Sequence, residues 1–236
     1  MIRGLSRVVA KGEEQLPMKI GIIGSGNIGG TLTRRLTALG HEVRVANSRG
    51  PESLRDLEKE TGATAVKATE AAQDAEIVVV TIPQGKVPDL PAGVFDGAAP
   101  GFVVVDTGNY YPQRDGRIAG IEDEGRTESA WVSGQLGQPV VKAFNNIYAD
   151  HLLNKGLPAG TPGRIALPVA GDDAGAKAKV LALVDELGFD PVDAGSIAES
   201  WRQQPATPVY TTDFDSDGVR AALAEATPER TAQFKG

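Results

Sequence analysis

The sequence predicts an α/β fold in which a parallel sheet is covered by helices on both faces. Short apolar segments rich in β-branched residues alternate with segments of helical periodicity along the chain, an alternation typical of such folds. The first apolar segment runs directly into a glycine-rich turn and a helical pattern. Residues 151–236 repeat the alternation on a smaller scale. We therefore expect a doubly wound parallel sheet followed by a small α/β carboxyl-terminal lobe.

Residues 19–23 form the first expected strand, because a short apolar run bounded by a turn is typical of a buried parallel strand. The pattern G-x-G-x-x-G follows at 24–29, and apolar residues then recur at helical spacing from Ile28 to Leu39. Gly40 stands where a helix commonly ends. Strand, glycine turn and helix in this order are the fingerprint of a Rossmann-type dinucleotide site. The alternative is an ordinary glycine-rich turn.

Each glycine of this turn has its own structural purpose. The first allows a tight turn, the second lets the backbone approach a pyrophosphate, and the third lets the helix pack closely on the strand. The start of the helix adds unpaired N–H groups and the positive end of its dipole. We therefore expect cofactor contacts from Gly24, Ser25, Gly26, Asn27, Ile28 and Gly29.

The residues after the second expected strand, 42–46, indicate which dinucleotide binds. An NAD site usually has a carboxylate here that holds the ribose 2′-hydroxyl. This chain instead has Asn47, Ser48 and Arg49, and the following helix start supplies Ser53. A hydroxyl and a guanidinium bind a 2′-phosphate, which a carboxylate would repel. The sequence therefore predicts NADPH as the cofactor; in the alternative, Ser48 caps the helix and Arg49 is a solvated surface charge.

Further strands are expected at Val66, 77–82, 102–106 and 139–144, and in the small lobe at 165–170 and 189–192. Helices are expected from about 176 to 187, at 196–199 and at 219–226. We divide the chain into a flexible extension (1–17), an NADP-binding domain (18–150) and a carboxyl-terminal lobe that completes the substrate cleft (151–236). Ligands of such sheets bind outside the carboxyl ends of the strands. The residues expected to ring the cofactor there are Ile82, Pro83, Gln84, Thr107, Gly108, Asn109, Asn145, Asn146 and Ile147.

Composition excludes several classes of function. The net charge of the 236 residues is −7, without a basic stripe, which argues against nucleic acid as a partner. No apolar run reaches the length of about 20 residues that a membrane helix needs. There is no cysteine, which excludes disulfides, thiolate metal sites and cysteine nucleophiles, and fits a cytoplasmic protein.

Few side chains stand out as acids, bases or metal ligands. We expect His41 to lie on the solvated surface and His151 to be structural or exposed, and we expect no metal site. The pair Asp172-Asp173 precedes a helix, where acidic residues favour the dipole. Tyr110 and Tyr111 are candidate proton donors or packing groups over a cofactor. Lys142 is expected to lie at the edge of the crevice or on the surface, with a catalytic lysine as the alternative.

This scarcity favours hydride transfer to a flavin-like ring. Such a reaction needs mainly face-to-face placement of two cofactors, whereas reduction of a ketone or imine needs a positioned acid. No residue is assigned with certainty to the chemistry. The candidates are Asn145, Asn146 and Tyr110.

In combination, several motifs resemble the coenzyme F420-dependent NADP oxidoreductases. They are G-I-I-G-S-G-N-I-G-G at 21–30, N-S-R-G-P-E-S at 47–53, V-V-V-T-I-P at 78–83, V-V-K-A-F-N-N-I-Y-A at 140–149, and V-A-G-D-D with D-A-G-S within 169–196. The resemblance implies a Rossmann-type domain with a small carboxyl-terminal lobe, generally homodimeric. It also implies transfer of the pro-S hydride between NADPH and C5 of a deazaflavin. The stretch K-A-F-N-x-I at 142–147 is also similar to the cytosolic domain of six-transmembrane metalloreductases, which pass hydride to a flavin.

The resemblance assigns roles by position. Ser25, Gly26, Asn27 and Ile28 would contact the pyrophosphate and ribose, Ser48 and Arg49 the 2′-phosphate, Pro83 the ribose, and Ile147 and Ala149 the nicotinamide. Archaeal members have His and Pro where this chain has Asn145 and Tyr148, so the NADPH half carries over better than the acceptor half. Two alternatives stay open: an NADPH-dependent reductase of a small carbonyl or imine, and a non-catalytic NADPH sensor.

Overall fold

The computed structural model describes residues 16–235, so residues 1–15 of the expected extension lie outside the described part. Six parallel strands form the central sheet in the order β3-β2-β1-β4-β5-β6. This is the strand order of the Rossmann fold, and it confirms the predicted fold class. The strands are β1 (Lys19–Ile23), β2 (Glu42–Ala46), β3 (Thr64–Ala65), β4 (Ile77–Val80), β5 (Val103–Asp106) and β6 (Val140–Lys142).

Both faces of the sheet are buried, as expected for parallel strands. Side chains alternate along β4: Ile77 and Val79 belong to one apolar cluster, and Val78 and Val80 to another. Helices α1 (Asn27–Ala38), α6 (Ala149–Asn154) and α7 (Ala174–Glu186) contribute to the first cluster, and α5 (Glu128–Leu136) to the second. The other helical elements are η1 (Pro51–Leu54), α2 (Arg55–Thr61), η2 (Ala68–Glu70), η3 (Gln84–Asp89), α3 (Pro112–Asp115), α4 (Ala119–Glu122), η4 (Ile197–Gln203), α8 (Ser216–Glu225) and η5 (Ala232–Phe234).

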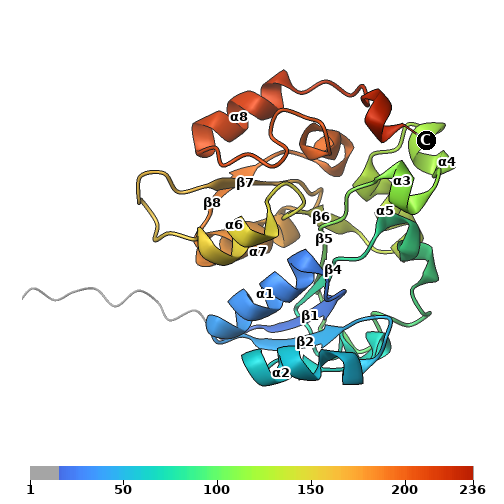
Figure 1. The fold of residues 1–236 in the computed structure, drawn as a ribbon, viewed down its shortest axis with the longest axis vertical. Helices are drawn as coiled ribbons and strands as arrows, with labels where there is room; N and C mark the ends of the chain where they lie inside the picture. The colour runs from blue at the N-terminus through green and yellow to red at the C-terminus, as the bar shows by residue number, and fades with distance from the viewer. Residues whose placement is uncertain (1–15, 236) are drawn as a thin grey trace, which may run out of the picture.

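The carboxyl-terminal lobe has its own small sheet. Strands β7 (Ala166–Val169) and β8 (Asp190–Asp193) pair in parallel, and α7 connects them. A single antiparallel bridge between Lys142 and Ala170 joins this pair to β6. After α8 the chain returns to the larger domain, where its end lies beside α3 and α4 in Figure 1. The boundary expected at residue 150 falls inside α6, which packs against α1.

Local periodicity located the long elements better than the short ones. Helix α5 was not predicted, because its buried residues Trp131 and Val132 are adjacent in sequence and give no helical stripe. The strand expected at Val66 ends one residue earlier, at Ala65. Within residues 16–235, no helix combines the length and apolar character needed to cross a membrane.

Candidate functional site

The glycine turn after β1 has the geometry that a phosphate-binding turn requires. Gly24 has φ +113°, and a Cβ on it would lie 2.2 Å from the carbonyl oxygen of Thr81. A Cβ on Gly29 would lie 1.9 Å from the carbonyl oxygen of Gly24. A Cβ on Gly26, by contrast, would meet no atom within 4 Å. The first and third glycines are therefore required by the fold, whereas the second leaves open space where a pyrophosphate can approach.

The start of α1 is prepared for an anion. Gly26 occupies the N-cap position, so no side chain caps the helix, and the first turn holds no acidic residue. The first N–H groups of a helix lack intrahelical partners and carry the positive end of its dipole. This arrangement fits the phosphates of a dinucleotide.

Asn47, directly after β2, organises the neighbouring hydroxyls. Its Nδ2 donates to Ser25 Oγ at 3.1 Å and to Ser53 Oγ at 2.9 Å. Its Oδ1 accepts from the backbone N–H of Arg49 at 2.9 Å. One amide side chain thus holds together three segments that are predicted to bind the cofactor.

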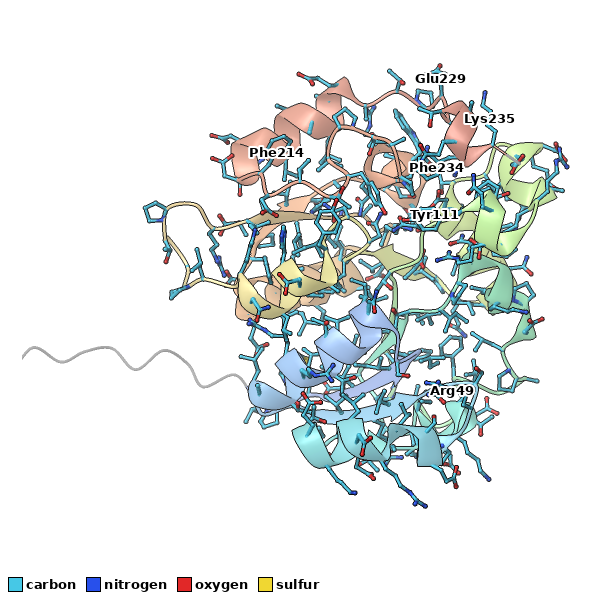
Figure 2. All side chains as sticks on the ribbon, in the orientation of Figure 1. Arg49, Tyr111, Phe214, Glu229, Phe234 and Lys235 are labelled. Carbon is cyan, nitrogen blue, oxygen red and sulfur yellow. The ribbon has the colours of Figure 1, made fainter. Side chains whose placement is uncertain are left out.

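Arg49 and Ser48 lie exposed beside this amide, and Figure 2 shows Arg49 on the sheet domain, well away from Phe234. Within residues 16–235, the Arg49 guanidinium forms no hydrogen bond or ion pair, whereas nearby Arg34 is paired with Glu60 at 2.6 Å. A cleft of about 470 Å³ runs between the glycine turn, the η1–α2 segment and α6. Its lining includes Ser25, Gly26, Asn27, Arg49, Ser53 and Ala149. The Arg49 guanidinium, which has no protein partner in the described part of the chain, therefore lines a cleft that begins at the glycine turn.

The strand ends lie along one edge of the sheet, as predicted, but their side chains differ in accessibility. Ile82 lies beside the glycine turn, since its Cγ2 would be 2.9 Å from a Cβ on Gly24, and Pro83 is exposed. Gln84 is fully buried and donates to the carbonyl oxygen of Glu128 at 3.0 Å. Ile147 packs into the apolar core, 5% exposed. The Gln84 and Ile147 side chains therefore pack inside the protein and anchor the loops after β4 and β6.

The two asparagines proposed as candidate catalytic residues are both buried. Asn145 Nδ2 donates to Asn109 Oδ1 at 3.0 Å, and its Oδ1 accepts from Gln203 Nε2 at 2.9 Å. Asn109 in turn donates to the carbonyl oxygen of Asn145 at 2.7 Å. Asn145 therefore ties the β5 and β6 loops to the small lobe and has no free group for chemistry. The Oδ1 of Asn146 is buried without a hydrogen-bond partner in the described part of the chain.

Tyr110, a candidate proton donor or packing group, lies in the core. Its ring is fully buried in the apolar cluster that also contains Val78, Val80 and the buried residues of α5. Its hydroxyl contacts Glu122 and the carbonyl oxygen of Gly116, the latter at 2.9 Å. Burial, together with the hydrogen bond to Glu122, raises the pKa of Tyr110 to about 12. The hydroxyl is thus used within the fold.

Its neighbour Tyr111 points to the junction of the two lobes. The Tyr111 hydroxyl is hydrogen-bonded to that of Tyr210, and its ring packs against Phe234 with centroids 5.8 Å apart. The guanidinium of Arg114 lies 4.8 Å from the Tyr111 centroid. Figure 2 shows Tyr111 below Phe234, where the carboxyl-terminal segment meets the sheet domain. No local pattern identifies Tyr210 or Phe234, because both are distant in sequence from Tyr111.

Two further expectations are corrected by burial. His41 is 6% exposed rather than solvated: its Nδ1 accepts from the N–H of Met18 at 3.1 Å, and its Nε2 lies 3.2 Å from Glu186. Lys142 is 1% exposed rather than at the surface, with its Nζ 3.4 Å from Asp106. Both side chains are enclosed because segments distant in sequence cover them.

The remaining singled-out residues have structural partners. His151 Nδ1 lies 2.7 Å from Asp213 Oδ1. Asp173 caps α7 by accepting from the N–H of Ala176, as expected for an acidic residue at a helix start, and Asp172 accepts from the N–H of Ile197. Among residues 16–235, no group of three or more His, Asp or Glu side chains is arranged to hold a metal ion.

Comparison with known proteins relates the chain to NADP-dependent oxidoreductases. The family model described as "NADP oxidoreductase coenzyme F420-dependent" matches residues 19–110. A hypothetical protein from Sinorhizobium meliloti is 32% identical, with TM-score 0.70 over 84% of this chain and 94% of that one. A candidate F420-dependent NADP reductase from Arthrobacter sp. FB24 is 26% identical, with TM-score 0.64 over 78% of this chain and 87% of that one.

Among curated relatives, metalloreductase STEAP3 from Rattus norvegicus is 30% identical over 81% of this chain and 36% of its own length. The chain spans less than half the length of the curated relatives it matches.

Proposed function

We propose that the chain, whose residues 19–110 match the family of coenzyme F420-dependent NADP oxidoreductases, transfers hydride between NADPH and a deazaflavin or flavin ring. The observation that carries the proposal is the cleft at the glycine turn. There the open space at Gly26, the uncapped start of α1 and the unpaired guanidinium of Arg49 meet. These features suit the pyrophosphate and the 2′-phosphate of NADPH.

In this proposal the protein binds and orients, while NADPH supplies the hydride when bound. The α1 N–H groups hold the pyrophosphate, and Asn47 orients the hydroxyls of Ser25 and Ser53 beside it. Arg49, with Ser48, holds the 2′-phosphate. The strand-end loops then direct the nicotinamide toward the junction of the two lobes. Placement of this kind accelerates a reaction between two bound rings without a protein acid or base.

The nature of the lobe junction favours a planar aromatic acceptor. Tyr111, Tyr210 and Phe234 gather there from both lobes. The lobe after β6 is built on the parallel strands β7 and β8, and the resemblance to deazaflavin-dependent reductases implies a small carboxyl-terminal lobe of this kind. We therefore favour a deazaflavin or flavin over a small carbonyl compound.

The test is NADPH oxidation, followed at 340 nm, with the purified protein and coenzyme F420, FMN or FAD. Rapid oxidation with one of these acceptors supports the proposal and identifies the acceptor. Tight NADPH binding without oxidation by any of them would contradict it. Turnover of a carbonyl or imine compound would then indicate a reductase of that class, and lack of any turnover a sensor.

We also propose that the protein is a homodimer, as the family resemblance implies, and that it is cytoplasmic. The absence of cysteine is compatible with that compartment. Light scattering coupled to size-exclusion chromatography would give a mass of about twice 24.6 kDa for a dimer. A mass equal to that of one chain would contradict the dimer.

A further inference from the structure

A buried group of charges lies directly beneath the turn 107–109, which follows β5. It consists of Asp106, Glu128, Lys142 and Arg230, and the first three side chains are only 1–2% exposed. Lys142 Nζ lies 3.4 Å from Asp106 and 3.9 Å from Glu128. Arg230 Nη2 lies 2.7 Å from Glu128 Oε1. Two cations and two carboxylates make the group electrically neutral.

This cluster binds both backbone polar groups of Gly108, its carbonyl oxygen and its N–H. Lys142 Nζ donates to the carbonyl oxygen of Gly108, and Asp106 Oδ1 accepts from the N–H of Gly108 at 2.8 Å. Ser129 Oγ donates to the other oxygen of Asp106 at 2.7 Å. The backbone of Gly108 is therefore fixed by a lysine and a carboxylate that are themselves fixed by their neighbours.

Gly108 is also confined by packing. A Cβ on it would lie 2.8 Å from Gln84 Oε1 and 2.9 Å from Asp106 Oδ1, so the loop after β4 presses against the turn. On the other side, Asn109 is tied to Asn145 in the loop after β6. The turn thus joins three strand ends at the edge where parallel sheets bind ligands.

Charge burial of this kind is costly. Desolvation of an ion pair often cancels its Coulomb attraction, and apolar residues of similar volume can replace such a pair without loss of stability. Stability alone therefore gives little reason for these charges. The hydrogen bonds from Lys142 and Asp106 to Gly108 give a specific reason for these charges, because the bonds set the position of the turn backbone.

We propose that Lys142 is a positioning residue that holds turn 107–109 against the nicotinamide half of the bound cofactor. The inference rests on the proposed function. The two ends of the cofactor then depend on different residues. Arg49 and the glycine turn bind the phosphate end, whereas Lys142 acts through Gly108 on the nicotinamide end alone.

The test compares two ligands that differ only at that end. NADPH contains the nicotinamide, and 2′-phospho-ADP-ribose retains both phosphate regions but lacks it. Both Kd values are measured by isothermal titration calorimetry for the wild-type protein and for Lys142→Met. We expect Lys142→Met to raise the Kd for NADPH at least fivefold and to change the Kd for 2′-phospho-ADP-ribose less than twofold. The change in nicotinamide fluorescence on binding should also fall by half or more.

Arg164→Met is the matched control. Arg164 is also buried, at 4% exposure, and its guanidinium contacts Asp185 and Asp190 at 2.7 Å and the carbonyl oxygen of Leu157. It lies in the small lobe and does not touch turn 107–109. Arg164→Met and Lys142→Met each remove one partner of a buried ion pair, so both should lose stability. Arg164→Met should nevertheless change both Kd values less than twofold. If Lys142→Met does not fold, Ser129→Ala removes one support of Asp106 and should raise the Kd for NADPH two- to threefold, again selectively.

The outcomes are distinguishable. The positioning role would be overturned if the folded Lys142 variant raised the Kd values for both ligands equally or left the Kd for NADPH unchanged. Either result would leave the proposed function standing. The same holds for Ser129→Ala if it is the variant used. If the wild-type protein bound neither ligand, the proposed function would fail and the inference with it.

Discussion

The hydroxyl groups of Tyr111 and Tyr210 are hydrogen-bonded to each other across the junction between the sheet domain and the small lobe. Burial, reinforced by this hydrogen bond, raises the pKa of Tyr210 above its ordinary value, so the Tyr210 hydroxyl stays protonated at neutral pH. Phe234 packs on the Tyr111 ring beside the pair. The relative placement of the two lobes is thus fixed by a contact at the proposed acceptor site.

We expect this hydrogen bond to appear as a coupling energy in a double-mutant cycle. Tyr111→Phe and Tyr210→Phe should each lower the free energy of unfolding by about 0.5–1.5 kcal/mol, the net worth of a neutral hydrogen bond. The double variant should lose little more than either single variant, since the same bond is removed. Urea unfolding measures all four proteins. Losses that simply add would show that the two hydroxyls do not act as a pair.

The parts of the structure that the sequence could predict are those set by local pattern. The turn at 24–29 and strands such as β4 follow from neighbouring residues, and the structure confirms them. The pairing of Tyr111 with Tyr210 joins residues 99 positions apart, and no local pattern predicts it. Lys142 is likewise buried, because it is covered by residues from other segments such as Asp106 and Glu128. The local sequence alone had not indicated this burial.

The two roles left open for Tyr110 could not be separated from the sequence, and the reason is a different one. Adjacent side chains of an extended segment point in opposite directions, so Tyr110 and Tyr111 cannot both face the cleft. The sequence contains both tyrosines but does not fix which one points inward. The structure places Tyr110 in the core and Tyr111 at the lobe junction. Candidate residues in a strand-end loop therefore need the fold before a role can be chosen.

Two glycines of the phosphate turn should respond in opposite ways to the same substitution. Gly26→Ala adds a methyl group that meets no protein atom within 4 Å, at an ordinary φ of −70°. The variant should keep its melting temperature but bind NADPH at least tenfold more weakly, because the methyl group occupies the pyrophosphate position. Gly29→Ala places its methyl group 1.9 Å from a carbonyl oxygen and should lower the melting temperature by several degrees. Thermal melts and NADPH titrations test both; full NADPH affinity in Gly26→Ala would exclude the turn as the phosphate site.

Arg49 should decide between NADPH and NADH. Arg49→Ala removes a charged donor from the 2′-phosphate and should cost NADPH binding about 1.5–3 kcal/mol, while NADH, which lacks that phosphate, should bind nearly as before. The matched control is Arg55→Ala, since Arg55 is an exposed arginine a few residues along the chain and does not line the cleft. Its affinities for both cofactors should be unchanged. Equal weakening of NADPH and NADH by Arg49→Ala would remove Arg49 from the phosphate site.

The buried Tyr110 should make the protein sensitive to alkaline pH. The phenol has a pKa near 10 in the unfolded chain and about 12 in the folded protein, so the folded state holds the proton more tightly. The resulting stability is fully present below pH 10, is lost as the pH rises toward 12, and amounts to roughly 2–3 kcal/mol. Tyr110→Phe cannot lose this proton. Its free energy of unfolding should therefore fall less steeply than that of the wild-type protein between pH 10 and 12.

At neutral pH the same variant should be less stable than the wild-type protein by about 1–3 kcal/mol, because the partners of the hydroxyl stay buried without it. Hydride transfer should be nearly unchanged, since the hydroxyl lies in the core and not at the lobe junction. Urea unfolding at steps from pH 7 to 12 gives both stability curves, and NADPH oxidation at pH 7 gives the rate. Parallel curves above pH 10 would show that Tyr110 does not titrate with a raised pKa. A large fall in the hydride-transfer rate would indicate that Tyr110 takes part in catalysis.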